Sequence, residues 1–238
     1  MLYTYLGDNM KILASDFDNT IFFLDYPEIN KKNIEAIRNF ISQGNIFCIV
    51  TGRNYSDLKV LLNENNIPYS YLICEDGAKI FNNVDYCLDT VLLDRKDIER
   101  IIPIIEDNNW DYYLDDGYNE TTNYDDCVKI VIKCNDSEEK EKIVNIIKSK
   151  INIHVYASRY HVNIINKSVN KENALKKLLN LEQLNHNLLR VIGDNQNDYE
   201  MLKAFEGAVI TKHHESLDSL MKDEYDTLSD YIKELMSK

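Results

Sequence analysis

Two carboxylates stand close together near the amino end of this chain. In the stretch KILASDFDNTIF, Asp16 and Asp18 follow an apolar run and are separated only by Phe17. Like charges at such range repel, so one must be protonated, bound to a cation or paired with a positive group from elsewhere in the chain. Taken alone, an aspartate at a strand end is commonly a helix cap or turn residue. The rest of the chain has to supply the partner.

Three other apolar segments also end in polar residues. These residues are Thr51, Gly52 and Arg53 after IFCIV, Glu75, Asp76 and Gly77 after YLIC, and Asp194, Asn197 and Asp198 after LLRVIG. The carboxyl ends of parallel strands are where open α/β sheets build their sites, so we expect these groups to meet. Lys171, which opens a later helix, is the expected cation, with Lys167 as the alternative. An oxygen-rich cluster of this kind favours Mg²⁺ completed by a substrate phosphate.

The order of strands and helices predicts a parallel sheet. In NKKNIEAIRNFISQG the apolar residues recur at helical spacing, with Asn30 as a possible cap and Gly44 as the stop, and a second helix is predicted over 55–65. Strand alternating with helix implies right-handed βαβ units. We therefore predict an α/β fold with a Rossmann-like, doubly wound parallel-sheet core.

The pattern changes between residues 79 and 165. Strand-like segments such as WDYYLDD and CVKIVIKC alternate there with two amphipathic helices, one after Asp94 and one after Asp136. Adjacent paired strands indicate an antiparallel α+β unit. The predicted organisation is a core of residues 1–78 and 166–238, interrupted by an inserted α+β cap domain of residues 79–165.

These residues resemble the haloacid dehalogenase (HAD) superfamily of phosphohydrolases. DFDNT resembles its DxDxT signature, TGR its second motif, Lys171 its third and GDNQND its fourth, GDxxND. The position of the insertion, EDGA after the third strand and VNKENAL around the lysine are similar to the Cof-type sugar-phosphatase branch. Asn19 replaces the usual glycine of the first motif, and Asp76 stands where this branch commonly has asparagine. Asn tolerates the left-handed turn that such a glycine allows better than most residues.

The resemblance implies a role for each group. Asp16 is the expected nucleophile, forming an aspartyl-phosphate, and Asp18 the general acid and base. The expected phosphate-binding groups are Thr51, Gly52, Lys171 and Asn197. The expected Mg²⁺ ligands are Asp16, Asp194 and the Asp18 backbone carbonyl, supported by Asp198. Arg53 is either part of the site or a surface salt-bridge partner.

The inserted domain is expected to close over the strand ends and to read the substrate. By position, Arg159, His161 and Asn163 on its last strand are the candidate specificity residues, although each could equally form the cap's own sheet face. Closure would exclude water from the reacting phosphate. A compact cap favours a small phosphorylated metabolite, such as a sugar phosphate, as substrate.

Composition restricts the partners. The formal charge of −13 over 238 residues argues against nucleic acid, because such binding neutralises phosphates with Lys and Arg. No apolar run approaches the ~20 residues that span a bilayer, and the amino end lacks a secretion-signal pattern, so we expect a cytoplasmic protein without membrane or obligate protein partners. Five scattered cysteines without CxxC favour reduced thiols, and the histidines show no zinc-ligand spacing.

Two other functions use similar residues. A phosphomutase would return the phosphoryl group to substrate, but no second phosphate-binding cluster is evident in the cap. A phosphoaspartate-switched signalling or binding protein would also combine acidic residues with a Thr and a Lys on a parallel sheet, but needs neither a carboxylate placed like Asp18 nor an inserted cap. The sequence therefore favours a Mg²⁺-dependent phosphatase of small metabolites.

Overall fold

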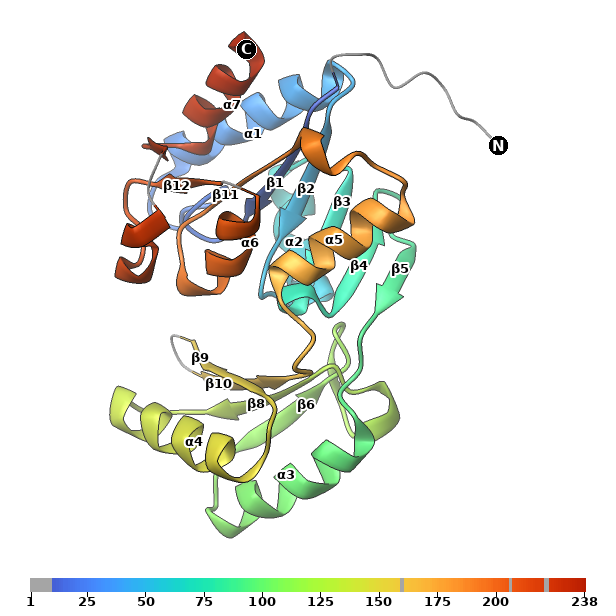
Figure 1. The fold of residues 1–238 in the computed structure, drawn as a ribbon, viewed down its shortest axis with the longest axis vertical. Coiled ribbons are helices and arrows are strands. Elements are labelled where there is room, and N and C mark those ends of the chain that lie inside the picture. Colours follow the sequence, from blue (N-terminus) through green and yellow to red (C-terminus); the bar gives the residue numbers. More distant parts are fainter. Residues whose placement is uncertain (1–9, 159–160, 206, 221–222) are drawn as a thin grey trace.

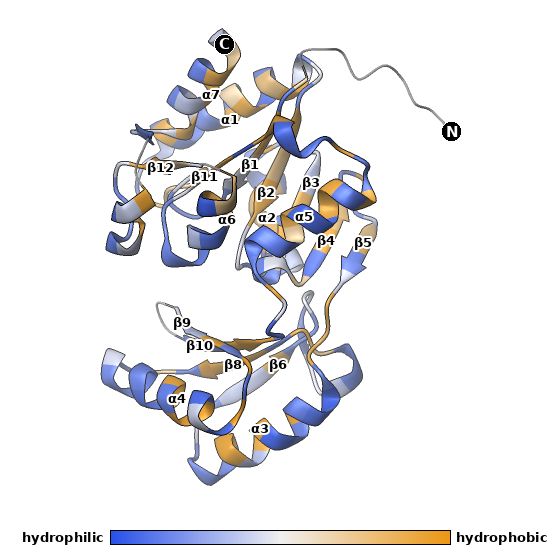
Figure 2. Cartoon of the chain, viewed as in Figure 1, coloured by the Kyte–Doolittle hydropathy of each residue, from blue (hydrophilic) through white to orange (hydrophobic). Residues whose placement is uncertain are grey.

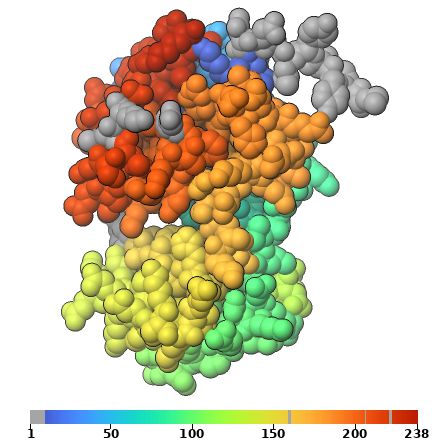
Figure 3. All heavy atoms as spheres, in the orientation of Figure 1, coloured from blue at the N-terminus to red at the C-terminus, as the bar shows by residue number. Residues whose placement is uncertain are grey.

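The structure, a computed structural model, describes residues 10–158, 161–205, 207–220 and 223–238. These residues form two lobes, each built on its own sheet, and the chain passes between the lobes twice (Figure 1). In the space-filling view the green and yellow lobe lies directly against the orange and red one (Figure 3). Among the described helices, none is both long and apolar enough to cross a bilayer.

The larger sheet is mostly parallel. Within the described residues its strand order is β13-β12-β11-β1-β2-β3-β4-β5; neighbours from β13 through β3 pair in parallel, and β4 and β5 are antiparallel. The strands are β1 (Ile12–Asp16), β2 (Ile46–Val50), β3 (Tyr71–Cys74), β4 (Lys79–Asn82), β5 (Cys87–Thr90), β11 (Leu189–Gly193), β12 (Ala208–Ile210) and β13 (Glu224–Tyr225).

Helices cover both faces of this sheet. One face packs against α1 (Pro27–Ser42), α2 (Tyr55–Asn65) and α7 (Leu228–Ser237), and the other against α5 (Lys171–Leu181) and α6 (Tyr199–Ala204). Strand β1 shows why its sequence is continuously apolar: Leu13 packs into the first layer, whereas Ile12 and Ala14 pack into the second. Successive side chains of a strand point to opposite faces, so a strand covered on both sides has no solvent face. The predicted doubly wound α/β class is confirmed.

The smaller sheet is antiparallel and has one helical face. Its order is β7-β6-β8-β10-β9. The elements are α3 (Arg95–Asp107), β6 (Tyr112–Asp115), β7 (Glu120–Thr121), β8 (Lys129–Lys133), α4 (Ser137–Lys150), β9 (His154–Ala157) and β10 (His161–Ile165). Ile130 and Ile132 of β8 point toward α3 and α4, which lie on the side away from the larger sheet (Figure 1). The apolar faces of these helices turn inward (Figure 2).

The predicted boundary at residue 79 does not follow the sheets. Strand β4 reverses after β3, with Lys79 opposite Cys74, and β5 continues the ladder, so residues 79–90 lie in the larger sheet. An alternating strand pattern does not show which sheet a strand joins. The partner of a strand is decided by the turn that precedes it and by the free sheet edge that lies next to that turn. We propose that the cap consists of residues 91–165 and the core of the remaining described residues.

Short 3₁₀ helices lie at several strand ends and loops. They are η1 (Glu75–Gly77), η2 (Tyr124–Asp126), η3 (His186–Leu188), η4 (Gln196–Asp198) and η5 (Glu215–Leu220). At η1 the residue Gly77 has φ +117°, and a Cβ there would lie 2.6 Å from the Asn170 carbonyl oxygen. Only glycine combines this backbone conformation with so close an approach, so Gly77 brings the turn after β3 against the start of α5.

Two local predictions are settled by the structure. Asn30 was expected to cap α1, but the helix begins earlier, at Pro27, whose fixed φ suits a first helical position. The Asn30 side chain instead makes two hydrogen bonds of 2.8 Å with the backbone of Phe23, bracing the loop that follows β1. Asn19 has φ +58°, which confirms the predicted left-handed turn.

Candidate active site

The polar strand ends meet at the edge of the larger sheet that faces the cap. Asp16 ends β1, Thr51 follows β2, Glu75 follows β3 and Asp194 follows β11. A cavity of about 290 Å³ lies between these strand ends and the facing cap sheet. Of the residues expected from the sequence, its lining contains Asp16, Asp18, Thr51, Gly52, Arg53, His161, Asn163, Asp194 and Asn197. Groups from the first, second and fourth motifs therefore meet in the lining, whereas Lys171 and Asp198 are buried beneath it and do not line the cavity.

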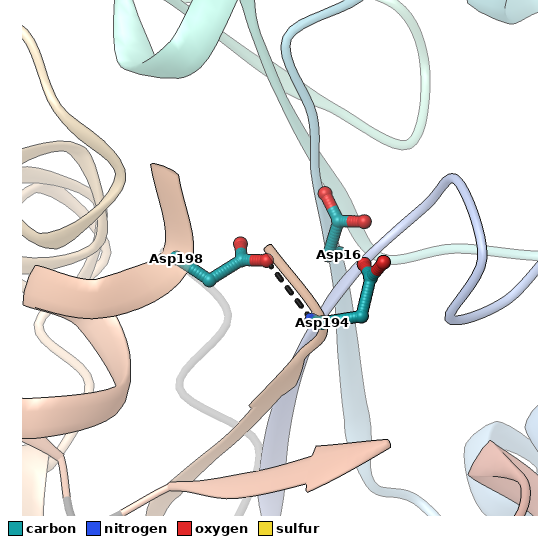
Figure 4. A group of neighbouring side chains, drawn as sticks. All are labelled: Asp16, Asp194 and Asp198. Carbon is teal, nitrogen blue, oxygen red and sulfur yellow. Dashed lines mark hydrogen bonds between the residues drawn. The ribbon is translucent and has the colours of Figure 1, made fainter. Parts of the chain in front are cut away.

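A lysine and three carboxylates form the buried floor of the site. Lys171 Nζ lies 2.5 Å from Asp16 Oδ1 and 2.6 Å from Asp198 Oδ1, and the lysine is 1% exposed. Asp16, Asp194 and Asp198 each offer an oxygen within 4.8 Å of the others (Figure 4). Lys167, the alternative lysine, is exposed and lines a separate small cavity. Lys171 is thus the lysine that the fold carries into the carboxylate cluster.

Burial and mutual repulsion dominate the electrostatics of this floor. Burial raises the pKa of Asp16 well above its ordinary value, with Lys171 opposing the shift. Burial and the nearby Asp198 raise the pKa of Asp194 to about 6. Burial disfavours the charge of Lys171, but Asp16 and Asp198 raise its pKa above the ordinary value. One ammonium therefore does not fully compensate the three carboxylates, and a further cation would be favoured there.

Asp198 fixes the backbone of the loop that carries Asp194. Its Oδ2 accepts hydrogen bonds from the backbone N–H groups of Asp194, at 3.1 Å, and Asn195, at 3.0 Å, as Figure 4 shows for Asp194. A Cβ on Gly193 would lie 2.5 Å from the Asp198 carboxyl carbon, so this glycine makes room for that arrangement. Asp194 accepts a hydrogen bond of 3.2 Å from Thr20. Asp198 is thus committed to holding the loop, whereas Asp16 and Asp194 keep lone pairs for a ligand.

Both oxygens of Asp18 are occupied by Arg53. The guanidinium donates to Oδ2 at 2.8 Å through Nε and to Oδ1 at 2.7 Å through Nη2. Paired parallel hydrogen bonds of this kind fix the orientation of both partners. Arg53 is therefore part of the site, and Asp18 is turned toward it and not into the three-carboxylate cluster.

A hydrogen-bonded corner joins the second and fourth motifs. Asp76 N–H donates to the Thr51 carbonyl at 3.0 Å, and Asp76 Oδ1 accepts from Asn197 Nδ2 at 2.9 Å. The other carboxylate oxygen accepts a hydrogen bond from the cap residue Tyr156. Asp76 and its neighbour Glu75 both have φ of +54°, a conformation that non-glycine residues rarely adopt and that clusters at functional sites.

The cap contributes a polar sheet face. Alternate residues of β6, β8 and β10 point into the cavity; they are Tyr113, Asp115, Lys129, Val131, His161 and Asn163. The Asn163 amide donates to Ser158 at 3.2 Å and is thus partly used within the cap. Arg159 lies outside the described residues.

Sequence reasoning missed Lys129, Tyr113 and Tyr156 as cavity residues. The signal that could have found Lys129 is the alternation in KIVIK, where Lys129, Val131 and Lys133 share the face opposite the buried isoleucines.

The carboxylate floor fits a divalent cation. Mg²⁺ prefers oxygen ligands and is commonly bound through one or two carboxylates plus substrate phosphate. Asp16 and Asp194 supply such oxygens at the floor of the cavity, where three carboxylates surround the single ammonium of Lys171. The Asp18 side chain is held away by Arg53.

The structure is thus of the α/β class, with a mostly parallel sheet that gathers an acidic floor under an inserted cap. The sequence model of the haloacid dehalogenase-like hydrolase family matches residues 13–125 and 113–223. The chain therefore belongs to this family. The predictions of a haloacid dehalogenase-type enzyme and of a hydrolase are confirmed.

Individual relatives are distant but align over most of the chain. A protein of Buchnera aphidicola subsp. Baizongia pistaciae, named as a candidate phosphatase, is 24% identical over 270 residues, covering 95% of this chain and 98% of its own. The fold resembles a HAD/COF-like hydrolase from Plasmodium vivax, with a TM-score of 0.83, 18% identity and coverage of 98% and 97%. It also resembles a sugar phosphatase of HAD subclass IIB, with a TM-score of 0.78, 16% identity and coverage of 95% and 99%.

Proposed function

We propose that this protein is a Mg²⁺-dependent phosphatase of small phosphorylated metabolites, with sugar phosphates as the first class to test. The observation that carries the proposal is the position of Asp16: its carboxylate is buried beside Lys171 and two further aspartates, at the floor of a cavity roofed by the cap. The family match supports a hydrolase, and the names of two similar proteins support a phosphatase and a sugar phosphate.

Asp16 acts as the nucleophile in this proposal. A carboxylate oxygen attacks phosphorus, the bond between phosphorus and the ester oxygen breaks, and the alcohol leaves with a proton from Asp18. Asp18 then takes a proton from water, the water oxygen attacks the aspartyl-phosphate, and Asp16 and inorganic phosphate are released. A covalent intermediate divides one difficult displacement into two easier steps.

Other residues hold the reacting groups. Lys171 orients Asp16 through its 2.5 Å contact and balances charge as phosphate enters. The Thr51 hydroxyl oxygen accepts the Arg53 N–H at 3.2 Å, which leaves the hydroxyl proton for a phosphate oxygen. Mg²⁺ bound by Asp16 and Asp194 would draw electron density from the phosphate and offset its negative charge. Asp18 can serve as acid and base only after Arg53 releases one of its oxygens, so we propose that substrate draws Arg53 away.

The test is phosphate release from an aryl phosphate and a panel of sugar phosphates, with and without Mg²⁺. The native protein is compared with Asp16→Asn and with Asp107→Asn, a control at the exposed end of α3. We expect Mg²⁺-dependent release by the native protein and the control, and none by Asp16→Asn. A long-lived phosphoaspartate without release would instead favour a switch protein, and transfer of phosphate between positions of one sugar would favour a mutase.

A further inference from the structure

A buried ion pair joins the cap to the core beside the catalytic cavity. Lys129 of β8 contacts the carboxylate of Glu75 in the turn after β3; Glu75 is fully buried and the Lys129 side chain is 9% exposed. Lys129 Nζ also donates to the Gly52 carbonyl at 3.4 Å, next to the proposed phosphate site. Lys129 therefore lies in the cavity wall, and Glu75 neutralises its positive charge there.

Among the described residues, the Glu75 carboxylate has no ion-pair partner other than Lys129. In the described part of the chain, Lys129 is the only polar contact of its carboxylate oxygens. Removing one member of a buried ion pair leaves an uncompensated charge and is strongly unfavourable. While Glu75 is ionised, Lys129 cannot turn toward a substrate anion without leaving this carboxylate in that state.

The remaining charges of the cavity wall are mostly negative. Among the described lining residues, the lysine and arginine side chains are Lys129 and Arg53, and Arg53 is held by Asp18. Asp57, Asp76 and Asp115 add carboxylates to the lining besides those of Asp16, Asp18 and Asp194. Once phosphate occupies the floor and has drawn Arg53 from Asp18 to itself, the space left for the alcohol part of a substrate has no uncommitted lysine or arginine among these lining residues.

We propose that Glu75 masks Lys129, so that the cavity selects phosphomonoesters whose alcohol part is uncharged or cationic and rejects those that carry a second negative group. The proposal rests on the proposed phosphatase function. It makes Glu75 a specificity-determining residue that acts through Lys129 without contacting substrate. A neutral polyol or an amino sugar fits this wall, whereas a second phosphate or a carboxylate meets like charge.

Three hexose derivatives with the same phosphate position test this selection in the native protein. They are glucose 6-phosphate, glucosamine 6-phosphate and 6-phosphogluconate, which add no charge, a positive charge and a carboxylate. We expect kcat/KM for 6-phosphogluconate to be about 100-fold lower than for glucose 6-phosphate. Like-charge contacts cost several kcal/mol, and each 1.4 kcal/mol changes kcat/KM tenfold. Equal or preferred hydrolysis of 6-phosphogluconate would overturn the masking alone. No release from any of the three under Mg²⁺ would overturn the phosphatase function, and the masking with it.

The variant Glu75→Gln identifies the cause. It keeps the shape of the side chain and removes its charge, so kcat/KM for 6-phosphogluconate should rise about tenfold or more while that for glucose 6-phosphate changes less than about threefold. The double variant Glu75→Gln with Lys129→Gln should lose this gain, because the unmasked cation is gone. The control Glu99→Gln removes an exposed partner of Arg95 on α3 and should leave kcat/KM for both substrates unchanged.

A merely structural role for the pair predicts a different result. In that case Glu75→Gln lowers kcat/KM for both substrates together, and the double variant does the same, which would refute the proposal. Far-ultraviolet circular dichroism and thermal melting confirm that each variant is folded. If Glu75→Gln does not fold, equal or preferred hydrolysis of 6-phosphogluconate by the native protein still overturns the proposal.

Discussion

Replacement of Lys171 by methionine should destabilise the protein strongly in the absence of metal. Methionine has a similar length but no charge, so Asp16, Asp194 and Asp198 would share a buried site without their ammonium partner. The pKa of Lys171 is raised above its ordinary value of 10.5 by Asp16 and Asp198, against the effect of burial. A cation with a raised pKa contributes its full stabilisation below 10.5 and loses it only at higher pH, so the loss applies at neutral pH.

The magnitude follows from burial. Lys171 is 1% exposed and its two partners are at most 6% exposed, so solvent does not screen these contacts. Breaking a buried ion pair by removing one partner costs about 3–5 kcal/mol. For a chain of this size 1 kcal/mol shifts Tm by about 2–4 °C, which predicts a decrease of about 6–20 °C.

The assay is thermal unfolding in metal-free buffer. The control Lys176→Met removes an exposed lysine of the same helix and its (i, i+4) pair with Glu172, which contributes about 0.5 kcal/mol or less. Adding Asp16→Asn to Lys171→Met removes one of the repelling carboxylates, so the double variant should melt above the single one. If Lys171→Met has the same Tm as the native protein, the expected cost of the uncompensated buried carboxylates is refuted.

Three further results are expected. Tyr156→Phe removes the cap's hydrogen bond to Asp76, and because hydrogen bonds to charged groups contribute about 1.5–3 kcal/mol, kcat/KM should fall about tenfold or more; an unchanged value would show that this contact does not support closure. Chelation of Mg²⁺ should abolish phosphate release, and Mg²⁺ at 100 times its Kd should raise the free energy of unfolding by about 2.7 kcal/mol, measured by melting; a Tm independent of Mg²⁺ would contradict the metal site. Burial raises the pKa of Glu75 to about 7; Lys129 opposes this shift, and Asp115 and Asp76 add to it. Glu75 is therefore neutral below pH 7 and ionised above it. The ratio of kcat/KM for glucose 6-phosphate to that for 6-phosphogluconate should therefore increase from pH 6 to pH 8 in the native protein. If this ratio changes with pH no more in the native protein than in Glu75→Gln, Glu75 is not the titrating group.

The order of elements and the family could be read from the sequence because both depend on local patterns. Helix α2 lies at the predicted residues 55–65, where Asn54 caps it, and β1 reads as a buried strand because both its faces are covered. The motif residues lie at strand ends, so parallel pairing alone brings Asp16, Thr51 and Asp194 to one edge of the sheet.

The pairing of charges was decided by the tertiary structure. Arg53 could have been a surface residue, but the turn after β2 places its guanidinium on Asp18, 35 positions earlier in the chain. Lys171 enters the carboxylate floor because α5 begins at that residue, whereas Lys167 precedes the helix and stays exposed. Membership of β4 and β5 in the larger sheet depends on the reversal at Gly77, which the strand pattern does not encode.

The sequence by itself determined the parallel core, the four motifs and the presence of an insertion, since side-chain periodicity and motif spacing are properties of neighbouring residues. Only the tertiary structure decided that Glu75 and Lys129, from different lobes, neutralise each other beside the cavity. Such a contact depends on how the cap lies on the core and on the left-handed backbone of Glu75. Neither is specified by any single stretch of the chain.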